Sequence, residues 1–467
     1  MLQLSIPFQY PATNKQVQKD ALTRHQHKKE FGVFYTDIEL AKDIVRFLKL
    51  DKNAVILDAQ CGEGHFLQAE QALGYKHVVG CDIDEDAVAA CKNKNGFCVF
   101  QKDSIWGEAD DVLETVNRGA KVDACIGNPP YAKLNPVNTL HCTDSELLQW
   151  TKTAGNNLFV AALRSTFNYV KKGGVVSLIV PKSMLYVNAY QQLRTFILQQ
   201  TTIQSIVDLG MVFKNVRGEQ VLITMSHQQP ADNKIAYYQY ANGQMKHLVK
   251  VSQQAFSDTI FFFYHKTDIS LYRKFLNINM RLSDFCTGYI GRGKNQSADA
   301  VAGKDIRKYG LKHGELPQEG RQLFVQNIYS RESGIIACYG GNLKAGQTIT
   351  VITDRDKRKC KYLLGLLHSR IANFYLIKYC YHCSSLTMHT DAKYLKKIPI
   401  VTDKKQFDRV VALTEELEKT DYLSPAWYQQ QQALDALFFD IYQLSEDERN
   451  YINLQMNMLQ SKKWMYG

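Results

Sequence analysis

The chain has 467 residues, enough for two or three domains with substantial buried cores. Hydrophobic residues make up 45% of it and charged residues 22%, which describes an ordinary globular protein and excludes a disordered one. The sequence shows no signal-peptide pattern, no apolar run as long as a membrane span, and eleven scattered cysteines that fit reduced thiols. We therefore expect a cytoplasmic protein without a membrane partner.

The net charge of +11 is unevenly distributed. Residues 281–400 hold 20 Lys and Arg against 9 Asp and Glu, while the rest of the chain holds 37 of each sign. A local excess of this kind indicates a surface that meets nucleic acid or anionic lipid. A merely solvated face is the alternative, but such faces usually mix the two signs, so a polyanionic partner is favoured.

The chain begins with a polar stretch, residues 1–30, that predicts an arm and a helix. Apolar residues at helical spacing then predict a helix over residues 38–48, capped by Thr36 or Asp37. The free N–H groups of a capped helix start can hold a carboxylate, although an ordinary cap explains the same residues equally well.

A glycine-rich turn follows the first predicted strand. The apolar run at residues 55–58 ends in Asp58, and Gly62 and Gly64 then open a helix over residues 66–73. In this strand–turn–helix context glycine lets the backbone approach a ligand closely. The third glycine of the dinucleotide fingerprint is missing, so the turn alone is a weak nucleotide signal.

Two further strands end in acids. The strand at residues 77–84 carries Asp82, about 20 residues beyond the glycine turn, where an acid can hold both hydroxyls of a ribose. The strand at residues 97–100 is followed by Asp103. Each acid could simply cap a helix, but that explanation becomes improbable when consecutive strand ends agree.

The fourth strand, residues 123–127, ends in Asn128, Pro129, Pro130 and Tyr131. The two prolines hold the carbonyl groups of this segment rigidly, the asparagine amide both donates and accepts hydrogen bonds, and the tyrosine ring is flat. This set suits a planar amino group, and it lies at the strand edge where α/β sheets bind ligands. A tight turn with an exposed tyrosine is the alternative.

Strands and helices continue to alternate, which predicts a doubly wound, mostly parallel sheet. The expected elements are a helix over 157–170, a strand over 175–180, a helix over 189–199, and strands over 203–209 and 220–225. The polar residues 132–155 suggest no element. Phe213, between the last two strands, is either core packing or the second aromatic ring of a base sandwich.

Composition changes near residue 240, so we expect a domain at residues 31–240, a basic domain at 241–402 and a helical segment at 403–467. Side chains that suit phosphates and base edges lie in two places of the basic domain. They are Arg292, Lys294, Asn295 and Gln296 in a glycine-rich loop, and the run Lys357, Arg358 and Lys359. A helix is expected over residues 363–379. Cys380 and Cys383 form one Cys-x-x-Cys without a matching pair, so no metal site is predicted.

Taken together, these motifs resemble the DNA adenine-N6 methyltransferases of bacterial restriction–modification systems in the gamma arrangement. In these enzymes the cofactor motifs precede the catalytic motif and a target-recognition domain comes last. The resemblance covers residues 28–225 by motif and residues 280–400 more loosely. It implies a Rossmann-like class I S-adenosylmethionine-dependent methyltransferase domain, with a mostly parallel sheet and an antiparallel last strand. A mixed α+β target-recognition domain would follow.

The resemblance also implies the site residues. Those for S-adenosylmethionine would be Tyr35, Thr36, Asp58, Ala59, Gly62, Gly64, Asp82, Ile83, Asp103, Ser104 and Asn128. Asn128, Pro129, Pro130 and Tyr131, with Phe213 opposite, would hold a flipped adenine. Two positions depart from the family pattern: Asp37 replaces a proline and Ser104 replaces an aromatic residue, which leaves the adenine contact open.

The implied partner is double-stranded DNA, with or without a separate restriction endonuclease. Two other methyl acceptors stay open: the glutamine amide of a protein, which also presents a planar amino group, and adenine in RNA. A protein substrate would not need a basic second domain. A DNA-binding subunit without catalysis conflicts with the complete set of cofactor motifs.

Overall fold

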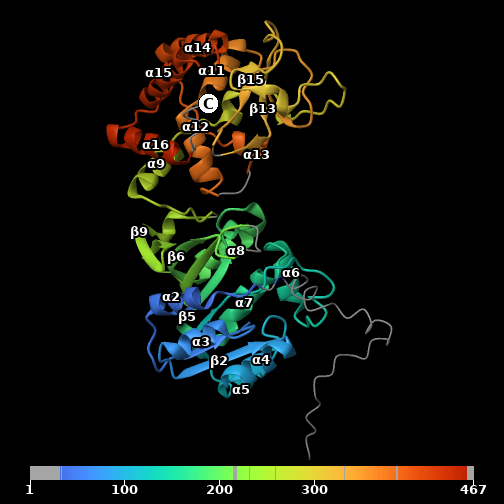
Figure 1. Cartoon of the computed structure of the whole chain (residues 1–467), viewed down its shortest axis with the longest axis vertical. Coiled ribbons are helices and arrows are strands. Elements are labelled where there is room, and N and C mark those ends of the chain that lie inside the picture. Colours follow the sequence, from blue (N-terminus) through green and yellow to red (C-terminus); the bar gives the residue numbers. More distant parts are fainter. Residues whose placement is uncertain are drawn as a thin grey trace, which may run out of the picture. The chain divides into compact units, whose positions relative to one another are not determined.

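The computed structural model describes residues 32, 34–213, 218–230, 232–257, 259–330, 332–384 and 388–459. The chain divides into two compact units, Met1–Ile260 and Phe261–Gly467 (Figure 1). The arm and helix expected over residues 1–30 lie outside the described residues. In the part of the chain that is described, no helix is both long and apolar enough to cross a membrane.

Unit 1 is built on a nine-stranded sheet with the order β3-β2-β1-β4-β5-β7-β6-β8-β9. The strands are β1 Val55–Asp58, β2 His77–Asp82, β3 Val99–Gln101, β4 Val122–Gly127, β5 Val170–Pro181, β6 Thr202–Gly210, β7 Gln220–Ser226, β8 Lys234–Ala241 and β9 Gln244–Ser252. The strands from β3 to β5 pair in parallel, and β7 runs antiparallel to both of its neighbours. The mostly parallel sheet expected from the sequence is therefore confirmed.

Helices cover this sheet because each parallel pair needs a crossover connection. The helices are α2 Ile38–Leu48, α3 His65–Ala72, α4 Glu85–Asn95, α5 Ala109–Asn117, α6 Ser145–Thr153, α7 Leu158–Tyr169 and α8 Gln191–Gln200. From β1 the chain proceeds first toward β3 and later, from β4, toward β5, so right-handed crossovers place the two helix groups on opposite faces. Accordingly α2 contacts α3, and α7 contacts α5 and α6 (Figure 1). The order reverses between β1 and β4, which is where such sheets bind ligands.

Unit 1 differs from the expected elements in two internal places. Residues 132–155, where the sequence suggests no element, contain α6, whose N-cap Asp144 accepts a hydrogen bond from the Leu147 amide. The basic and glycine residues after α7 do not form a loop but begin β5, which has a register shift opposite β4. Basic residues followed by glycine are typical of the end of a helix, but here they belong to a strand that pairs with its neighbour.

The end of unit 1 also differs. The expected domain boundary at residue 240 falls within the hairpin of β8 and β9, which extends the sheet beyond β6. Asn242 and Gly243, which suggest a linker by composition, both have positive φ and form the tight turn of this hairpin. The structure divides instead between Ile260 and Phe261.

Unit 2 combines a small antiparallel sheet with helices. The sheet has the order β10-β16-β13-β15, and two short ribbons pair β11 with β12 and β14 with β17. These strands are β10 Ile290–Arg292, β11 Ile306–Arg307, β12 Gly310–Leu311, β13 Gln322–Gln326, β14 Ile328–Tyr329, β15 Ala337–Tyr339, β16 Ile349–Thr353 and β17 Met388–His389. Unit 2 thus contains both helices and antiparallel strands, and its expected role as a target-recognition domain stays a prediction.

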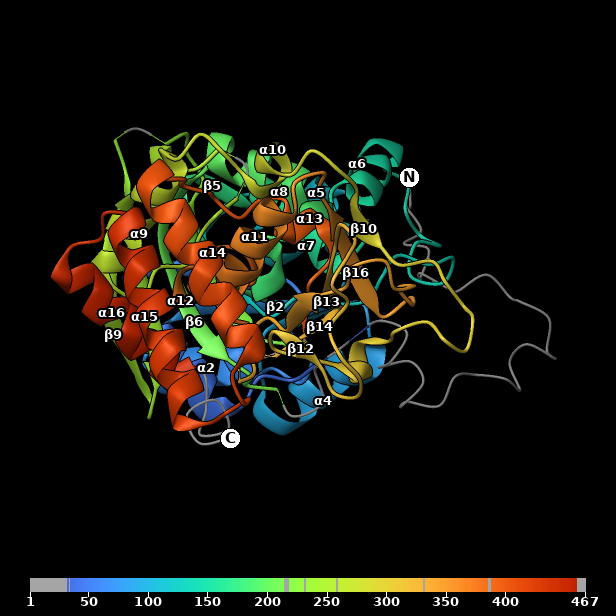
Figure 2. The ribbon, with the colours of Figure 1, turned by 90° about the horizontal axis from the view of Figure 1, so that it is seen from above.

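The helices of unit 2 are α9 Lys266–Leu276, α10 Leu282–Phe285, α11 Lys357–His368, α12 Arg370–Tyr375, α13 Ala392–Leu395, α14 Lys404–Lys419, α15 Pro425–Ile441 and α16 Glu446–Leu459. Figures 1 and 2 show α14 beside α11 and α15, in agreement with their contacts. The single helix expected over 363–379 is interrupted because the Ser369 side chain caps α12, accepting from the Ala372 amide.

One buried side chain of unit 1 is poorly accommodated. Glu70, on α3, is 0% exposed, and neither of its carboxyl oxygens has a hydrogen-bond partner among the residues that the structure describes. Burial, with a smaller contribution from Asp58, raises the pKa of this carboxyl well above its ordinary value. The group is therefore held in its neutral form at a cost in stability.

We expect Glu70→Met to stabilise unit 1 by about 1–3 kcal/mol, the usual cost of an unsatisfied buried polar group. Because the folded-state pKa is raised, the wild type loses stability as pH rises from the ordinary glutamate pKa toward the folded value, so the gain should be larger at alkaline pH. Thermal unfolding at acidic and alkaline pH measures both effects. Gln71→Met, on the exposed side of the same helix, is the control, and an equal gain at both pH values would contradict this account.

Candidate functional site

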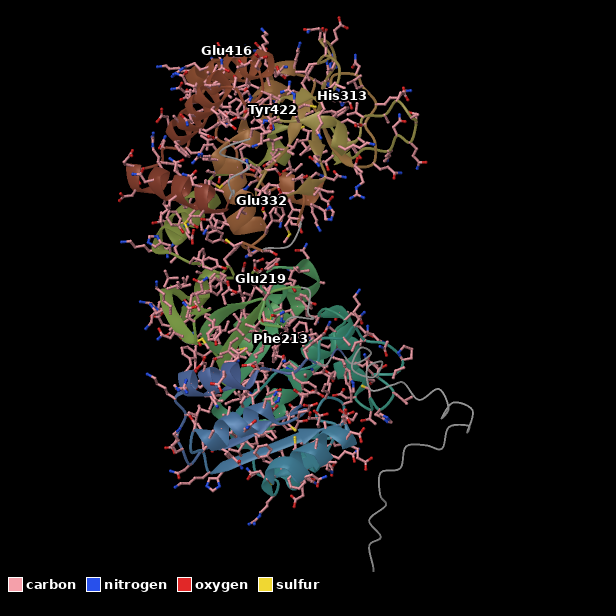
Figure 3. The ribbon with its side chains drawn as sticks, viewed as in Figure 1. Phe213, Glu219, His313, Glu332, Glu416 and Tyr422 are labelled. Atoms are coloured by element: carbon pink, nitrogen blue, oxygen red, sulfur yellow. The ribbon has the colours of Figure 1, made fainter. Side chains whose placement is uncertain are left out.

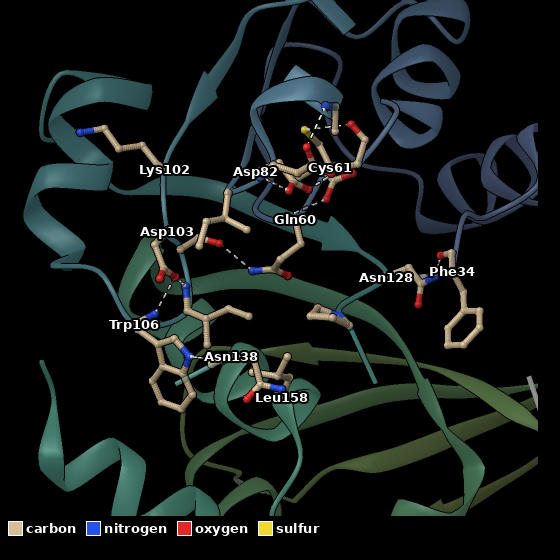
Figure 4. A pocket seen from close by; sticks show the side chains of 18 of the residues that line it. Phe34, Gln60, Cys61, Asp82, Lys102, Asp103, Trp106, Asn128, Asn138 and Leu158 are labelled. Carbon is tan, nitrogen blue, oxygen red and sulfur yellow. Dashed lines mark hydrogen bonds between the residues drawn. The ribbon is translucent and has the colours of Figure 1, made fainter. Parts of the chain in front are cut away.

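A cavity of about 300 Å³ lies in unit 1 at the carboxyl ends of the central strands. Figure 4 shows side chains that surround it, among them Asp82, Asp103 and Asn128. Of the residues expected at the site, Tyr35, Thr36, Asp58, Gly62, Asp82, Ile83, Asp103, Ser104, Asn128 and Pro130 line it. Ala59, Gly64, Pro129 and Tyr131 are adjacent in the chain to lining residues but do not line the cavity themselves, and neither does Phe213.

The glycine turn after β1 is fixed by the acid at the end of β2. The Gly62 amide donates to Asp82 Oδ2 at 2.8 Å, and Asp82 Oδ1 accepts from the Asp84 amide at 3.0 Å. Gly62 has φ +51, and a Cβ there would lie 2.9 Å from the Tyr35 ring. Only glycine therefore allows the Tyr35 ring to pack against this turn. Burial raises the pKa of Asp82.

Asp58, at the end of β1, lies in direct contact with the end of β4. It is 2% exposed, and a Cβ at residue 127 would lie 2.7 Å from its Oδ1, so Gly127 leaves the space that this carboxyl occupies. Burial raises the pKa of Asp58 well above its ordinary value, and the nearby Asp82 adds to the shift, while the Gln60 amide opposes it. A cationic group in the cavity would favour the ionised form of Asp58.

Two buried polar atoms of the cavity lining have no partner among the described residues: Thr36 Oγ1 and Asp103 Oδ2. Of the two caps expected for α2, Asp37 is the one found, and its side chain accepts a hydrogen bond from the Glu39 amide at 2.9 Å. The Thr36 side chain does not cap the helix. Asp103 Oδ1 accepts from the Ile105 and Trp106 amides. Buried polar atoms normally find a partner, so both atoms indicate a polar ligand.

Ser104, at the position where the family has an aromatic residue, forms hydrogen bonds with the turn after β1. Its hydroxyl donates to the Ala59 carbonyl and accepts from Gln60 Nε2 at 2.8 Å. The residue is 3% exposed and joins the end of β3 to the turn after β1. The apolar part of the cavity wall comes instead from Ile83, Ile105 and Leu158.

Asn128 and Tyr131 form one hydrogen-bonded unit. The Tyr131 hydroxyl lies 2.7 Å from Asn128 Oδ1 and 3.0 Å from the Ile179 carbonyl, and it can donate its proton to only one of them at a time. Asn128 Nδ2 donates to the Phe34 carbonyl at 2.8 Å. Burial raises the pKa of Tyr131 well above its ordinary value, so its hydroxyl stays protonated. Asn128 Oδ1 retains a second lone pair for another donor.

Phe213 lies in the apolar cluster against which Tyr131 also packs, and it is 7% exposed. Figure 3 labels Phe213 in unit 1. Its position in this structure is that of a core residue, and a role beside a base stays a prediction.

The loop after the Asn-Pro-Pro-Tyr segment also lines the cavity, which the sequence did not reveal. Asn138 holds this loop together: its Nδ2 donates to the Lys133 carbonyl, its Oδ1 accepts from the Asn135 amide, and its carbonyl accepts from Trp106 Nε1 at 2.8 Å. Leu140, from the same loop, lines the cavity although it is 66% exposed. No periodicity marks such a loop, but its Asn-rich composition is typical of side chains that bond to backbone.

The basic residues expected to bind DNA are in unit 2. The Arg292 side chain is 59% exposed and lies 3.4 Å from Asp391, while Lys294 and Gln296 are exposed. Asn295 Oδ1 accepts from the Ser297 amide, which orders the loop. The run Lys357–Lys359 forms the first turn of α11, where each side chain already has a contact within the unit: with Gln318, Asp408 and Phe285 respectively.

These features match a known family. Residues 76–213 match the Eco57I restriction-modification methylase family, and the resemblance expected from the motifs, to restriction–modification methyltransferases, is thereby confirmed. The match begins at the second strand of the sheet and extends through the Asn-Pro-Pro-Tyr segment.

Two curated type II methyltransferases are also similar to part of this chain. The type II methyltransferase M.VspI of Vibrio sp. (strain 343) is 24% identical over 228 residues, which are 48% of this chain and 54% of that protein. M.HincII of Haemophilus influenzae is 23% identical over 211 residues, 44% of this chain and 39% of that protein. The matches thus span about half the length of these relatives, or less.

The fold is shared with the solved structure of the type IIL restriction-modification enzyme MmeI in complex with DNA. The TM-score is 0.53 at 12% identity, over 91% of this chain and 75% of that chain.

We expect Asn138→Ala to loosen the cavity loop and to weaken binding of the cofactor expected from the sequence, S-adenosylmethionine, about tenfold, since the two side-chain hydrogen bonds to Lys133 and Asn135, roughly 0.5–1.5 kcal/mol each, are lost. Isothermal titration calorimetry measures the affinity, and hydrogen exchange of residues 133–143 measures the loop. Asn117→Ala is the matched control, because that amide also bonds its own loop but lies at the end of α5. Faster exchange with unchanged affinity would show that the loop does not serve the cavity.

Proposed function

We propose that this protein is an S-adenosylmethionine-dependent DNA methyltransferase that transfers a methyl group to the N6 amino group of a flipped adenine. The observation that carries the proposal is the Asn128–Tyr131 unit, placed where β4 ends beside a cavity with two orphaned polar atoms. The match to the restriction-modification methylase family supports the reaction class, and Asn in place of Ser before Pro-Pro-Tyr favours adenine over cytosine by resemblance.

The residues present fit the cofactor. Thr36 Oγ1 and the start of α2 would bind its carboxylate, and Asp58 would pair with its amino group. Asp82 would accept from the ribose hydroxyls, and Asp103 Oδ2 from the adenine amino group. Ile83, Ile105 and Leu140 would enclose the base. When bound, the cofactor supplies a methyl group on a positively charged sulfur.

Asn128 would activate the nucleophile. The N6 lone pair of adenine is delocalised into the ring, and hydrogen bonds from N6 to Asn128 Oδ1 and to the Pro129 carbonyl would favour the tetrahedral, nucleophilic state. The Tyr131 hydroxyl and the Phe34 carbonyl fix the orientation of the Asn128 amide. As the N6–methyl bond forms, positive charge develops on N6, and the two acceptors stabilise it until a proton leaves.

The target base must leave the duplex to reach Asn128. The Tyr131 ring would stack on it, with Phe213 opposite after a rearrangement of the apolar cluster in which both rings lie.

The excess of positive charge in residues 281–400 and the exposed Arg292 and Lys294 support double-stranded DNA as the partner. MmeI, which shares the fold, was solved in complex with DNA. A separate restriction endonuclease is a further partner consistent with the family, and the cytoplasm is the corresponding compartment.

We expect Asn128→Ala to reduce methyl transfer about 10²–10³-fold, the range for removal of one preorganised electrostatic group, while cofactor binding is largely kept. Radiolabelled S-adenosylmethionine is incubated with duplex DNA, structured RNA and a cell lysate, and the product is tested for N6-methyladenine. Asn188→Ala, an exposed asparagine outside the cavity lining, is the control.

Label in DNA that disappears with Asn128→Ala supports the proposal. Label confined to protein or RNA would instead identify one of the other acceptors with planar amino groups. A fully active variant would remove Asn128 from the mechanism.

We also expect the affinity for S-adenosylmethionine to fall as pH is lowered through the raised pKa of Asp58, because only the carboxylate pairs with the cofactor's ammonium group. The slope should approach about one decade per pH unit below that pKa. Calorimetric titrations at a series of pH values on both sides of neutrality measure the slope. Asp58→Asn should bind weakly with a flatter profile, Asp82 contributing what remains, and an unchanged slope would exclude Asp58 as the cause.

A further inference from the structure

A second cavity, of about 430 Å³, lies within unit 2. Its wall combines Lys308 in the turn between β11 and β12, residues 330–336 in part, the start of α12, and one face of α15 with the connection before it. Figure 3 labels Glu332 and Tyr422, two of its residues. The volume is within the range of small-molecule sites, roughly 300–1,000 Å³. The proposed methyl transfer makes no use of this cavity.

Lys308 is the main polar feature of the wall. It is 4% exposed, which is rare for lysine. Burial lowers its pKa to about 7; Asp435 opposes the shift and Arg370 adds to it. A buried lysine with this pKa gains its charge readily when an anion binds beside it.

The turn that carries Lys308 is strained. Tyr309 has φ +61, unusual for an aromatic residue, and is held by three contacts: its amide donates to the Ala337 carbonyl, its hydroxyl donates to Gln431 Oε1 at 2.8 Å, and its ring lies 4.1 Å from that of His368. Strain of this kind persists where the surroundings over-determine it, often at ligand sites. Here it fixes the residue after Lys308.

The other charged side chains of the wall are Arg370, Asp435 and Glu332. The Arg370 backbone amide donates to Asp435 Oδ1 at 2.7 Å, and Arg370 Nε lies 3.6 Å from Asp435 Oδ2. Arg370 Nη1 also donates to Asn453. Burial raises the pKa of Asp435 to about 6. Glu332 is exposed, and burial lowers the pKa of the neighbouring His368 well below its ordinary value, which keeps it neutral. The basic groups of this wall are therefore Lys308 and Arg370, and its acidic groups are the buried Asp435 and the exposed Glu332.

The remaining wall is aromatic and rich in donors. Tyr422, Trp427 and Tyr428 line the cavity. Trp427 Nε1 and the Tyr428 hydroxyl are buried without a hydrogen-bond partner among the residues that the structure describes. A ligand with acceptor oxygens would suit both the spare donors and the two basic side chains of the wall, Lys308 and Arg370.

We propose that this cavity binds a small organic anion with a planar ring, the chemistry of a nucleoside monophosphate, with Lys308 at the phosphate and the Tyr422–Tyr428 aromatic group beside the ring. The site is independent of the proposed methyl transfer and lies wholly in unit 2.

The test is calorimetry on the full-length protein with uridine monophosphate, uridine and inorganic phosphate, a pyrimidine being chosen because the proposed cofactor carries a purine. At about pH 8 Lys308 is mostly neutral when free, so anion binding should take up close to one proton, seen by comparing buffers of different ionisation enthalpy. The nucleotide should bind at least tenfold more tightly than uridine.

Two variants locate the site. Lys308→Met should weaken nucleotide binding at least tenfold and abolish proton uptake, whereas Lys312→Met, an exposed lysine of the same region, should do neither. Gln432→Trp, at an exposed position of α15 that lines the cavity, should block binding while Lys308 is kept. Absence of nucleotide binding, or binding that neither variant weakens, would overturn the proposal. Inorganic phosphate binding as tightly as the nucleotide would overturn the role of the ring.

Discussion

The contact between Asp58 and Gly127 is the constraint on which the site of unit 1 depends. Parallel pairing of β1 and β4 brings their carboxyl ends to one edge, and the absence of a side chain at Gly127 lets the Asp58 carboxyl lie against β4. Asp58, one of the groups expected for the cofactor, and the Asn128–Tyr131 unit are therefore neighbours across a single pair of strands. Their separation is set by a sheet rather than by loops, which is the rigidity that a transfer between two bound groups requires.

The site keeps several polar groups out of water. Asp58 is buried and Asp82 is partly buried, both with raised pKa values, and Thr36 Oγ1 and Asp103 Oδ2 have no partner among the described residues. Each of these groups costs folding free energy that a bound polar ligand can return. The same surroundings exclude solvent and so strengthen any hydrogen bond made by a ligand.

The strand ends were predictable from the sequence because their signals are local: an apolar run, then an acid or glycine, repeated at βα spacing. The parallel sheet and the place of the cavity at the carboxyl ends of its strands follow from that pattern, while the family resemblance named ten of the residues that line the cavity. The loop around Asn138 was not predictable, because its order comes from hydrogen bonds to Trp106 and to its own backbone. Likewise β8 and β9 resemble a linker by composition and are strands only because β6 offers an unpaired edge. The interruption of the expected helix at Ser369 depends on a capping hydrogen bond, which the spacing of apolar residues does not reveal.

The segment that begins with Asn128 continues without interruption into the Asn138 loop, and the beginning of that loop is tied to the start of α7: Asn157 Nδ2 donates to the Tyr131 carbonyl, and the Leu158 amide donates to the Ala132 carbonyl. One piece of backbone thus bears the amino-group acceptors at one end and a wall of the cofactor cavity at the other. A ligand that fills the cavity stiffens the acceptors as well. Under the proposed function, this coupling would suit an ordered sequence of substrate addition, in which the small cofactor enters first and the polymer substrate meets an already rigid receptor.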